Sequence, residues 1–183
     1  MLKDIEILDE MLRDDVKIPL KERDGWREVK LSEEQGKKYF VSLTGLPCNA
    51  VVIKADAFSS PSAVFRGEKG ECKRADFVIV ADDVKQKVII FVEMKAKKGS
   101  RSKIIQQLQG AYCFVTYCRE IGKSFWGKEN FLDGYDYRYV SITPEYNIRA
   151  QPTRYRRSDE VLHDQAGSML KIHDNYLRFS DLI

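Results

Sequence analysis

Two acidic residues and a lysine interrupt segments of the chain that are otherwise strongly apolar. Asp76 stands in RADFVIVA (residues 74–81), and Glu93 and Lys95 stand in KVIIFVEMK (residues 87–95). Two neighbouring carboxylates repel each other, and burying either one without compensation is costly. Mg²⁺ would compensate them, since proteins commonly hold it with one or two carboxylates plus water and substrate phosphate. The residue types predict metal-assisted hydrolysis of a phosphodiester, with Lys95 orienting or deprotonating the attacking water.

The spacing of the two segments decides whether the acids can meet. Val, Ile and Phe dominate both segments, and the polar DDVKQ between them predicts a hairpin. A turn between Val84 and Lys85 places Asp76 directly opposite Glu93, on the same side of the sheet and with Cβ atoms about 4.5 to 5.5 Å apart. Lys95, two residues after Glu93, falls on that side as well. The alternative is a salt bridge of Lys95 with either acid that only staples the end of a sheet.

The surrounding pattern predicts a mixed α/β fold. Both faces of the 87–95 strand are apolar, so it should lie centrally, with helices or other chain covering both faces. Apolar residues at helical spacing predict a helix from Ser102 to about Ile121, capped by Ser100 or Ser102 and ending near Gly122. Further elements are expected as an opening helix at 3–13 and strands at 38–43, 50–58 and 136–142. This order gives an α/β sandwich on a small sheet.

Length and composition fit one soluble domain. The chain has 183 residues, of which 43% are hydrophobic and 32% charged. We expect a core over about residues 38–142 and a C-terminal extension over 143–183 that packs through Leu177, Phe179 and Leu182. The longest nearly apolar run, 88–94, is far shorter than the roughly 20 residues of a membrane span. The N-terminal residues lack the features of a signal peptide, so a cytoplasmic location and no membrane association are expected.

Cysteines and histidines are too scattered for a zinc site. The chain has Cys48, Cys72, Cys113 and Cys118, with no CxxC pair, and His163 and His173. We interpret the cysteines as reduced thiols of a cytoplasmic protein.

The acidic motif resembles that of a known family. Ala75-Asp76, sixteen intervening residues and Glu93-Met94-Lys95 are similar to the motif of the PD-(D/E)XK nuclease superfamily, the restriction-endonuclease-like proteins. The resemblance covers about residues 50–142. It implies an αβββαβ core with a small mixed central sheet flanked by helices, in which the Asp begins the second strand and the Glu and Lys end the third. Ala75 replaces the family's proline, a common relaxation.

The resemblance also implies roles for individual residues. Mg²⁺, or Mn²⁺ in its place, would be held by Asp76, Glu93 and the carbonyl of Met94. Lys95 would position the water nucleophile. Gln107, in the IIQQLQGAY segment of the following helix, would support the catalytic group.

Two further assignments stay open. Gln106 or Gln109 would take the place of Gln107 if the helix is rotated, and any of these glutamines could instead lie on a solvated helix face. An upstream acid could assist the metal, and the candidates are Glu6, Glu10, Glu33 and Glu34.

Positive charge gathers on both sides of the motif although the net charge is only +3. The residues expected to bind nucleic acid are Lys73, Arg74, Lys97, Lys98, Arg101 and Lys103. Arg66 and Lys69 extend the first group, and a third basic group lies at 149–157. Such runs are often solvated faces, but here they predict a basic rim through which a polyanion reaches the metal.

The expected activity is that of a DNA endonuclease in restriction, repair or anti-phage defence. No helix-turn-helix or zinc finger is apparent, so backbone contacts should dominate recognition. Cutting both strands of a duplex suggests a homodimer or a subunit of a larger nuclease complex. One alternative is a catalytically inactive module of this fold that binds nucleic acid or a protein partner. Another is a small domain in which the acids and lysine only staple a sheet.

Overall fold

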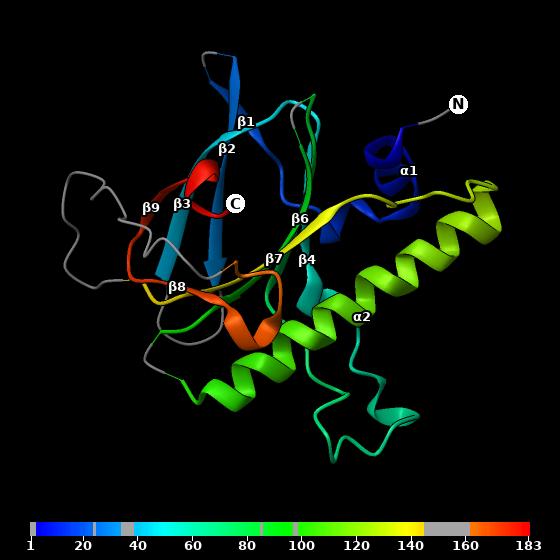
Figure 1. Ribbon diagram of the computed structural model, residues 1–183, viewed down its shortest axis with the longest axis vertical. Helices are drawn as coiled ribbons and strands as arrows, with labels where there is room; N and C mark the ends of the chain where they lie inside the picture. The colour runs from blue at the N-terminus through cyan, green and yellow to red at the C-terminus, as the bar shows by residue number, and fades with distance from the viewer. Residues whose placement is uncertain (1–2, 24, 34–38, 85, 97–98, 145–161) are drawn as a thin grey trace.

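The computed structural model describes residues 3–23, 25–33, 39–84, 86–96, 99–144 and 162–183 (Figure 1). The fold is mixed α/β with two mixed sheets, which confirms the predicted class. One sheet has the strand order β4-β5-β6-β7-β8 and the other β1-β2-β3-β9. The elements are α1 (Asp4–Met11), β1 (Lys21–Arg23), β2 (Trp26–Glu33), β3 (Tyr39–Leu46), β4 (Ala50–Lys54), β5 (Phe77–Asp82), β6 (Lys87–Met94), α2 (Arg101–Trp126), β7 (Asp136–Ile142), β8 (Leu170–Ile172) and β9 (Tyr176–Arg178).

The hairpin of β5 and β6 has the predicted register. Phe77 pairs with Val92 at one end of the hairpin, and Asp82 pairs with Lys87 at the other. Asp83 and Gln86 exchange backbone hydrogen bonds across the turn. β7 has the predicted bounds and lies parallel to β6, so β6 is central in its sheet.

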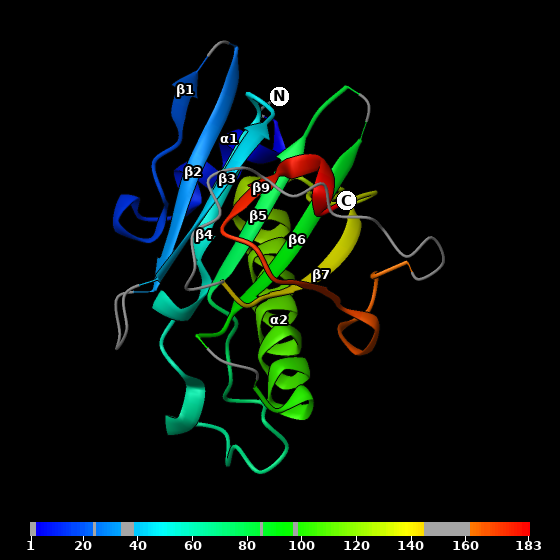
Figure 2. The same cartoon turned by 90° about the vertical axis from the view of Figure 1, so that its left-hand side faces the viewer.

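The two faces of the five-stranded sheet are covered differently. Ile89 and Phe91 of β6 pack into a cluster with α1 and α2, whereas Ile90 and Val92 pack into a second cluster with β2 and β3. Figure 2 shows α2 behind the five-stranded sheet and the four-stranded sheet on its other side. The expectation that helices flank the sheet is therefore wrong for one of its two faces.

The strand β2 was not anticipated, because its apolar signal is weak. Between the opening helix and the strand expected at 38–43, the sequence predicts only a polar stretch that holds Pro19, Gly25 and Gly36. In the structure, only Val29 and Leu31 of β2 are fully buried. Both side chains point toward the five-stranded sheet, while the strand's other face is largely solvated. Two buried side chains suffice when a strand has only one face to cover.

Helix α2 is longer than predicted and ends at Trp126, because the next residue, Gly127, has a φ of 64° in the left-handed region. The expected end at Gly122 is wrong, because that glycine lies inside the helix against Phe131. A Cβ at position 122 would lie 2.1 Å from the Phe131 ring. Ser100 is the N-cap residue, although its side chain makes no capping hydrogen bond.

The described residues of the C-terminal segment, 162–183, contribute strands as well as core side chains. β8 pairs with β7 and β9 with β3, so this segment adds a strand to each sheet. Leu177, Phe179 and Leu182 are buried, as predicted. None of the helices in the described part of the chain has the length and apolar character needed to cross a membrane.

Candidate active site

The acids of the motif lie where β5 begins and β6 ends. Asp76 precedes Phe77, the first paired residue of β5, so continuing the register puts it opposite Glu93. Glu93 belongs to the face that α2 covers, since its neighbours Val92 and Met94 pack toward the other sheet. The backbone N–H of Met94 donates to Asp76 Oδ2 at 2.5 Å. The carboxylate of Asp76 therefore reaches across to the end of β6.

Lys95 connects the buried acid with the solvent. Glu93 has no exposed surface, and its Oε1 forms an ion pair with Lys95 Nζ. The Lys95 side chain is 29% exposed. Since Asp76 is also partly exposed, small molecules in the solvent can reach this edge of the acid pair. The structure thus brings together the three residues that the sequence singled out.

The N-terminal half of α2 supports the segment that leads into Asp76. Gln107 Nε2 donates to the Arg74 carbonyl at 3.3 Å. Gln106 accepts a hydrogen bond from Lys73 Nζ and donates to the Lys69 carbonyl at 3.0 Å, and Gln109 is exposed. Gln107 therefore contacts the backbone two residues before Asp76.

A glycine lets α2 approach this segment closely. A Cβ at Gly110 would lie 1.8 Å from the Lys73 carbonyl oxygen, so only glycine fits at this point of the helix. Sequence reasoning missed this contact. The available signal was the glycine itself, because glycine inside a helix costs about 1 kcal/mol relative to alanine and usually has a packing reason.

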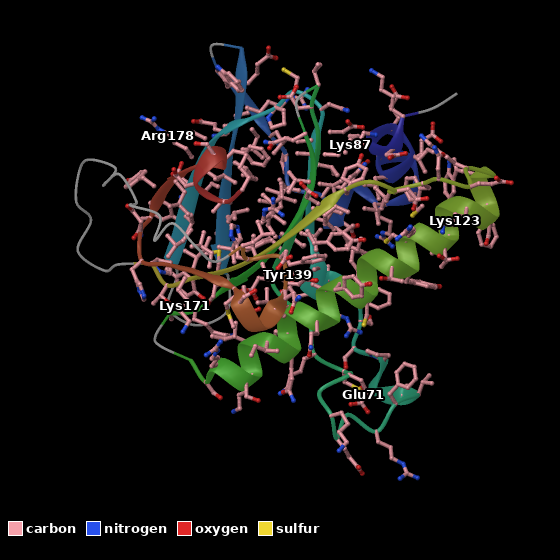
Figure 3. The ribbon with its side chains drawn as sticks, viewed as in Figure 1. Glu71, Lys87, Lys123, Tyr139, Lys171 and Arg178 are labelled. Carbon is pink, nitrogen blue, oxygen red and sulfur yellow. The ribbon has the colours of Figure 1, made fainter. Side chains whose placement is uncertain are left out.

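The loop before Asp76 is held together from within. The Glu71 carboxylate accepts hydrogen bonds from the N–H groups of Gly67 and Lys69, both at 2.9 Å. Backbone N–H groups, its own first and then those of this loop, hold the pKa of Glu71 below its usual value. Figure 3 shows Glu71 on this loop, which projects away from the sheet beside α2.

The predicted nucleic-acid-binding residues differ in their surroundings. Lys73 bonds to Gln106, and Arg74 donates to the Lys73 carbonyl at 2.7 Å and stacks on Phe58 at 4.9 Å. Burial lowers the pKa of Arg74. These two residues fix the loop, whereas Arg101 and Lys103 are exposed on the first turn of α2. Outside the described residues lie Lys97, Lys98 and the basic group at 149–157.

Two of the four candidate upstream acids lie far from the site. Glu10 accepts a hydrogen bond from Trp126 Nε1 at 3.0 Å, and Glu6 accepts one from the Lys3 amide at 2.7 Å. Trp126 ends α2, about 28 Å along the helix from Gln107. Neither acid of α1 can therefore assist a metal at Asp76. Glu33 ends β2 in the other sheet, and Glu34 lies outside the described residues.

The donor set suits magnesium better than zinc. The described residues contain no group of three or more His, Cys, Asp or Glu side chains that could hold a metal. Zinc sites usually need three or four such ligands, whereas Mg²⁺ takes one or two carboxylates and completes its octahedron with water and phosphate. Asp76 and Glu93, with the Met94 carbonyl, therefore fit a magnesium ion.

The cysteines and histidines have other surroundings. Cys118 of α2 is buried in the core, and burial raises the pKa of its thiol to about 12. Cys48 and Cys113 are exposed. His163 is buried with Nε2 2.9 Å from the Leu182 carbonyl oxygen, and His173 is exposed.

Two polar residues that the sequence did not reveal extend the acidic pair across the sheet. Ser141 of β7 pairs with Glu93, and Lys171 of β8 pairs with Ser141. Ser141 is 5% exposed. Their register depends on parallel pairing between strands that are distant in sequence, so no local pattern could predict it.

The site combines two carboxylates in opposed register, an amine that pairs with one of them, and a helix that supports the segment carrying the other. Groups of these types are the ones that a metal-dependent hydrolase uses. No model of a known protein family, no curated protein and no solved structure matches this chain.

Proposed function

We propose that the protein is a Mg²⁺-dependent nuclease that hydrolyses phosphodiester bonds of DNA and serves restriction, repair or anti-phage defence in the cytoplasm. The observation that carries the proposal is the opposition of Asp76 and Glu93 on adjacent strands, with Lys95 in contact with Glu93. Like charges directly opposed on a sheet are destabilising. A bound cation would offset the repulsion between the two acids, and an anionic substrate would then complete the coordination of that cation.

The order of elements also supports the proposal. Helix α1 comes first, β4, β5 and β6 form an antiparallel meander, and α2 leads to β7, which lies parallel to β6. This αβββαβ order, with the Asp at the start of the middle strand and Glu-Met-Lys at the end of the next, resembles the PD-(D/E)XK core. The strands β1, β2 and β3 are an insertion between α1 and that core.

Each residue of the site has a separate role in the proposed reaction. Asp76, Glu93 and the Met94 carbonyl would hold Mg²⁺, which supplies positive charge for the developing negative charge on phosphate and lowers the pKa of a water. Lys95 Nζ orients the attacking water. The water gives up one proton to solvent as its oxygen bonds to phosphorus, the P–O ester bond breaks, and the departing oxygen takes a proton from solvent. Gln107 keeps the segment before Asp76 in position.

One active site cuts one strand. Cleavage of both strands of a duplex therefore calls for a homodimer or for a larger nuclease complex in which this chain is one subunit. Such a complex would also supply sequence recognition.

A cleavage assay tests the proposal. Purified protein is incubated with supercoiled plasmid, linear duplex, single-stranded DNA and RNA, each with Mg²⁺, Mn²⁺ or EDTA. Cleavage that requires the metal and is lost in Lys95→Ala and Asp76→Asn is expected, because each variant removes one group of the site. Asp82→Asn, at the other end of β5, is the matched control and should cut normally. Cutting of wild-type strength by Lys95→Ala or Asp76→Asn would refute these roles.

A second candidate is an inactive module of the same fold that binds nucleic acid or a protein partner. The ion pair between Lys95 and Glu93 favours it, because a lysine held by an acid can stabilise a sheet end without taking part in a reaction. This candidate predicts nucleic-acid binding that EDTA does not change, and no cleavage with any metal.

A further inference from the structure

We propose that Ser141 and Lys171 form a phosphate-binding subsite that holds a phosphate of the substrate strand next to the one that is cleaved. The inference rests on the proposed function and deepens it, because it names a further part of the substrate and the side of the acids on which that part lies.

The register of three parallel strands aligns Glu93 with two other polar residues. Glu93 of β6 pairs with Ser141 of β7, and Ser141 pairs with Lys171 of β8. With Asp76 on the other side of Glu93, four polar residues stand in one row across four neighbouring strands. Strands lie about 4.8 Å apart, so the backbone of Lys171 is about 10 Å from that of Glu93.

Glu93, Ser141 and Lys171 project from the same face of the sheet. The flanking residues of β7, Val140 and Ile142, pack toward the four-stranded sheet, and so do Leu170 and Ile172 of β8. Ser141 and Lys171 lie between those residues and therefore project toward the α2 side, as Glu93 does. Figure 3 shows Tyr139 and Lys171 on this side of the sheet.

Along the row, the residue types change from acids to hydrogen-bond donors, and an anion needs donors. The acids occupy β5 and β6, and the residues on β7 and β8 are a hydroxyl and an ammonium, which donate hydrogen bonds. Ser141 is 5% exposed, so its hydroxyl lies beside the buried Glu93, where aromatic side chains otherwise fill the face of β7. Lys171 is exposed and can meet a phosphate from solvent.

The location fits a binding site as well. β6, β7 and β8 run parallel and end at the same edge, where ligands of parallel sheets commonly bind. The backbone pairing continues past the strands, since Lys95 N–H donates to the Ile142 carbonyl and Thr143 N–H to the Ile172 carbonyl, both at 2.8 Å. A substrate strand that reaches Lys95 from this edge passes Ser141 and Lys171.

Binding measurements in an inactive background test the subsite without relying on catalysis. A fluorescent single-stranded DNA 20-mer is titrated with Asp76→Asn protein at several salt concentrations, with and without Lys171→Ala. Loss of one phosphate contact should weaken binding about tenfold and reduce the salt slope by about one. Lys171→Arg should retain the contact, and Lys123→Ala, on α2 far from the site, is the matched control. Equal affinity and slope for the Lys171→Ala and Lys123→Ala proteins would overturn the inference.

Neutral-backbone substrates locate the contact. In a series of oligonucleotides, each carries a methylphosphonate in place of one phosphate. A methylphosphonate next to the cleaved bond should lower the DNA affinity of the protein that retains Lys171 about tenfold. The same methylphosphonate should not change the DNA affinity of the Lys171→Ala protein. Penalties that are the same with and without Lys171 would overturn the inference. Absence of any cleavage by wild-type protein would instead refute the nuclease proposal, while these binding measurements would still report on the subsite.

Discussion

Strand β5 carries an aspartate near each end, Asp76 just before its start and Asp82 at its end, and the surroundings of the two differ. At the far end, Asp82 lies 3.5 Å from Lys87 Nζ and accepts a hydrogen bond from the Tyr135 hydroxyl at 3.2 Å. Asp4 of α1 joins this group and lies 2.7 Å from Lys128 Nζ. A phenol thus stands beside both carboxylates there, and each of them has a lysine.

At the site end the two acids face each other directly. Asp76 and Glu93 belong to adjacent strands, Lys95 pairs with Glu93, and the Met94 amide bonds to Asp76. An amide stabilises a carboxylate but brings no net charge. The same residue types thus form two different arrangements at the two ends of one strand, and we propose catalysis only for the end with Asp76 and Glu93. At one end the two acids are opposite each other in the sheet register. At the other end Tyr135 stands between Asp82 and Asp4, and each acid pairs with its own lysine.

The largest expected effect separates the two ends by activity. Glu93→Gln should lower the rate of Mg²⁺-dependent cleavage about a thousandfold, or about 4 kcal/mol of barrier, because it removes a charge from the reacting group and keeps its shape. Asp82→Asn should cut at the wild-type rate. Single-turnover cleavage of a labelled duplex measures both, and similar rates for the two variants would erase the distinction between the ends.

Stability should show the reverse pattern. Asp4→Ala removes the ion partner of the largely buried Lys128, so the free energy of unfolding should fall by about 3 kcal/mol. Asp76→Asn should change it by no more than about 1 kcal/mol, because an asparagine oxygen can still accept the Met94 amide. Urea denaturation measures both variants. A larger loss for Asp76→Asn than for Asp4→Ala would mean that the site acids are the staple.

Two glycines of α2 sharpen the comparison. Alanine at Gly110 would collide with the Lys73 carbonyl, and alanine at Gly122 with the Phe131 ring, so each should cost about 1 to 3 kcal/mol of stability. Only Gly110→Ala shifts the segment before Asp76, so it alone should slow cleavage, by about tenfold. Thermal unfolding and cleavage well below the melting temperature test the pair, and slow cleavage by Gly122→Ala would argue against a local effect.

The smallest effect is a pH dependence at the far end. Burial, and then the charges of Asp4 and Asp82, raise the pKa of the Tyr135 hydroxyl above its usual value of 10, and burial also raises that of Tyr139. The native state keeps these protons when the unfolded chain loses them, so this stability is present below pH 10 and falls as the pH rises above it.

The variant Tyr135→Phe tests this dependence. Each proton that only the native state retains changes the free energy of unfolding by about 1.4 kcal/mol per pH unit. Above pH 10, the slope of stability against pH should therefore be smaller in the variant than in the wild type by about 1.4 kcal/mol per pH unit. Urea unfolding between pH 9 and 11.5 measures the slopes. Equal slopes for wild-type and variant would mean that the hydroxyl is not held in its protonated form.

Local features of the chain were predictable from the sequence. The hairpin register follows from two apolar segments and the short turn between them, and it alone puts Asp76 opposite Glu93. The strand at 136–142 follows from alternation, and the helix after Ser100 follows from the helical spacing of its apolar residues. The hairpin and the helix depend on contacts between residues close in sequence, and the strand at 136–142 has a local alternation of side chains.

Features that depend on distant contacts were not predictable. The sheet that covers the second face of β6 could not be foreseen from β2, which buries only Val29 and Leu31 fully. The row that joins Glu93, Ser141 and Lys171 needs the parallel pairing of three strands, and β8 has only three residues. The sequence contains the residues of such a row but not the register that aligns them.

Metal binding at the acid pair is the central claim, and paramagnetic broadening by Mn²⁺ tests it most directly. In a proton–nitrogen NMR spectrum of the backbone amides of this 183-residue chain, substoichiometric Mn²⁺ should broaden the resonances around Met94 first. The reason is that the Met94 N–H donates to the Asp76 carboxylate. The broadening should vanish in the Asp76→Asn/Glu93→Gln double variant and persist in Asp82→Asn. Broadening centred on Asp82 and Lys128, or none that the double variant removes, would contradict the account.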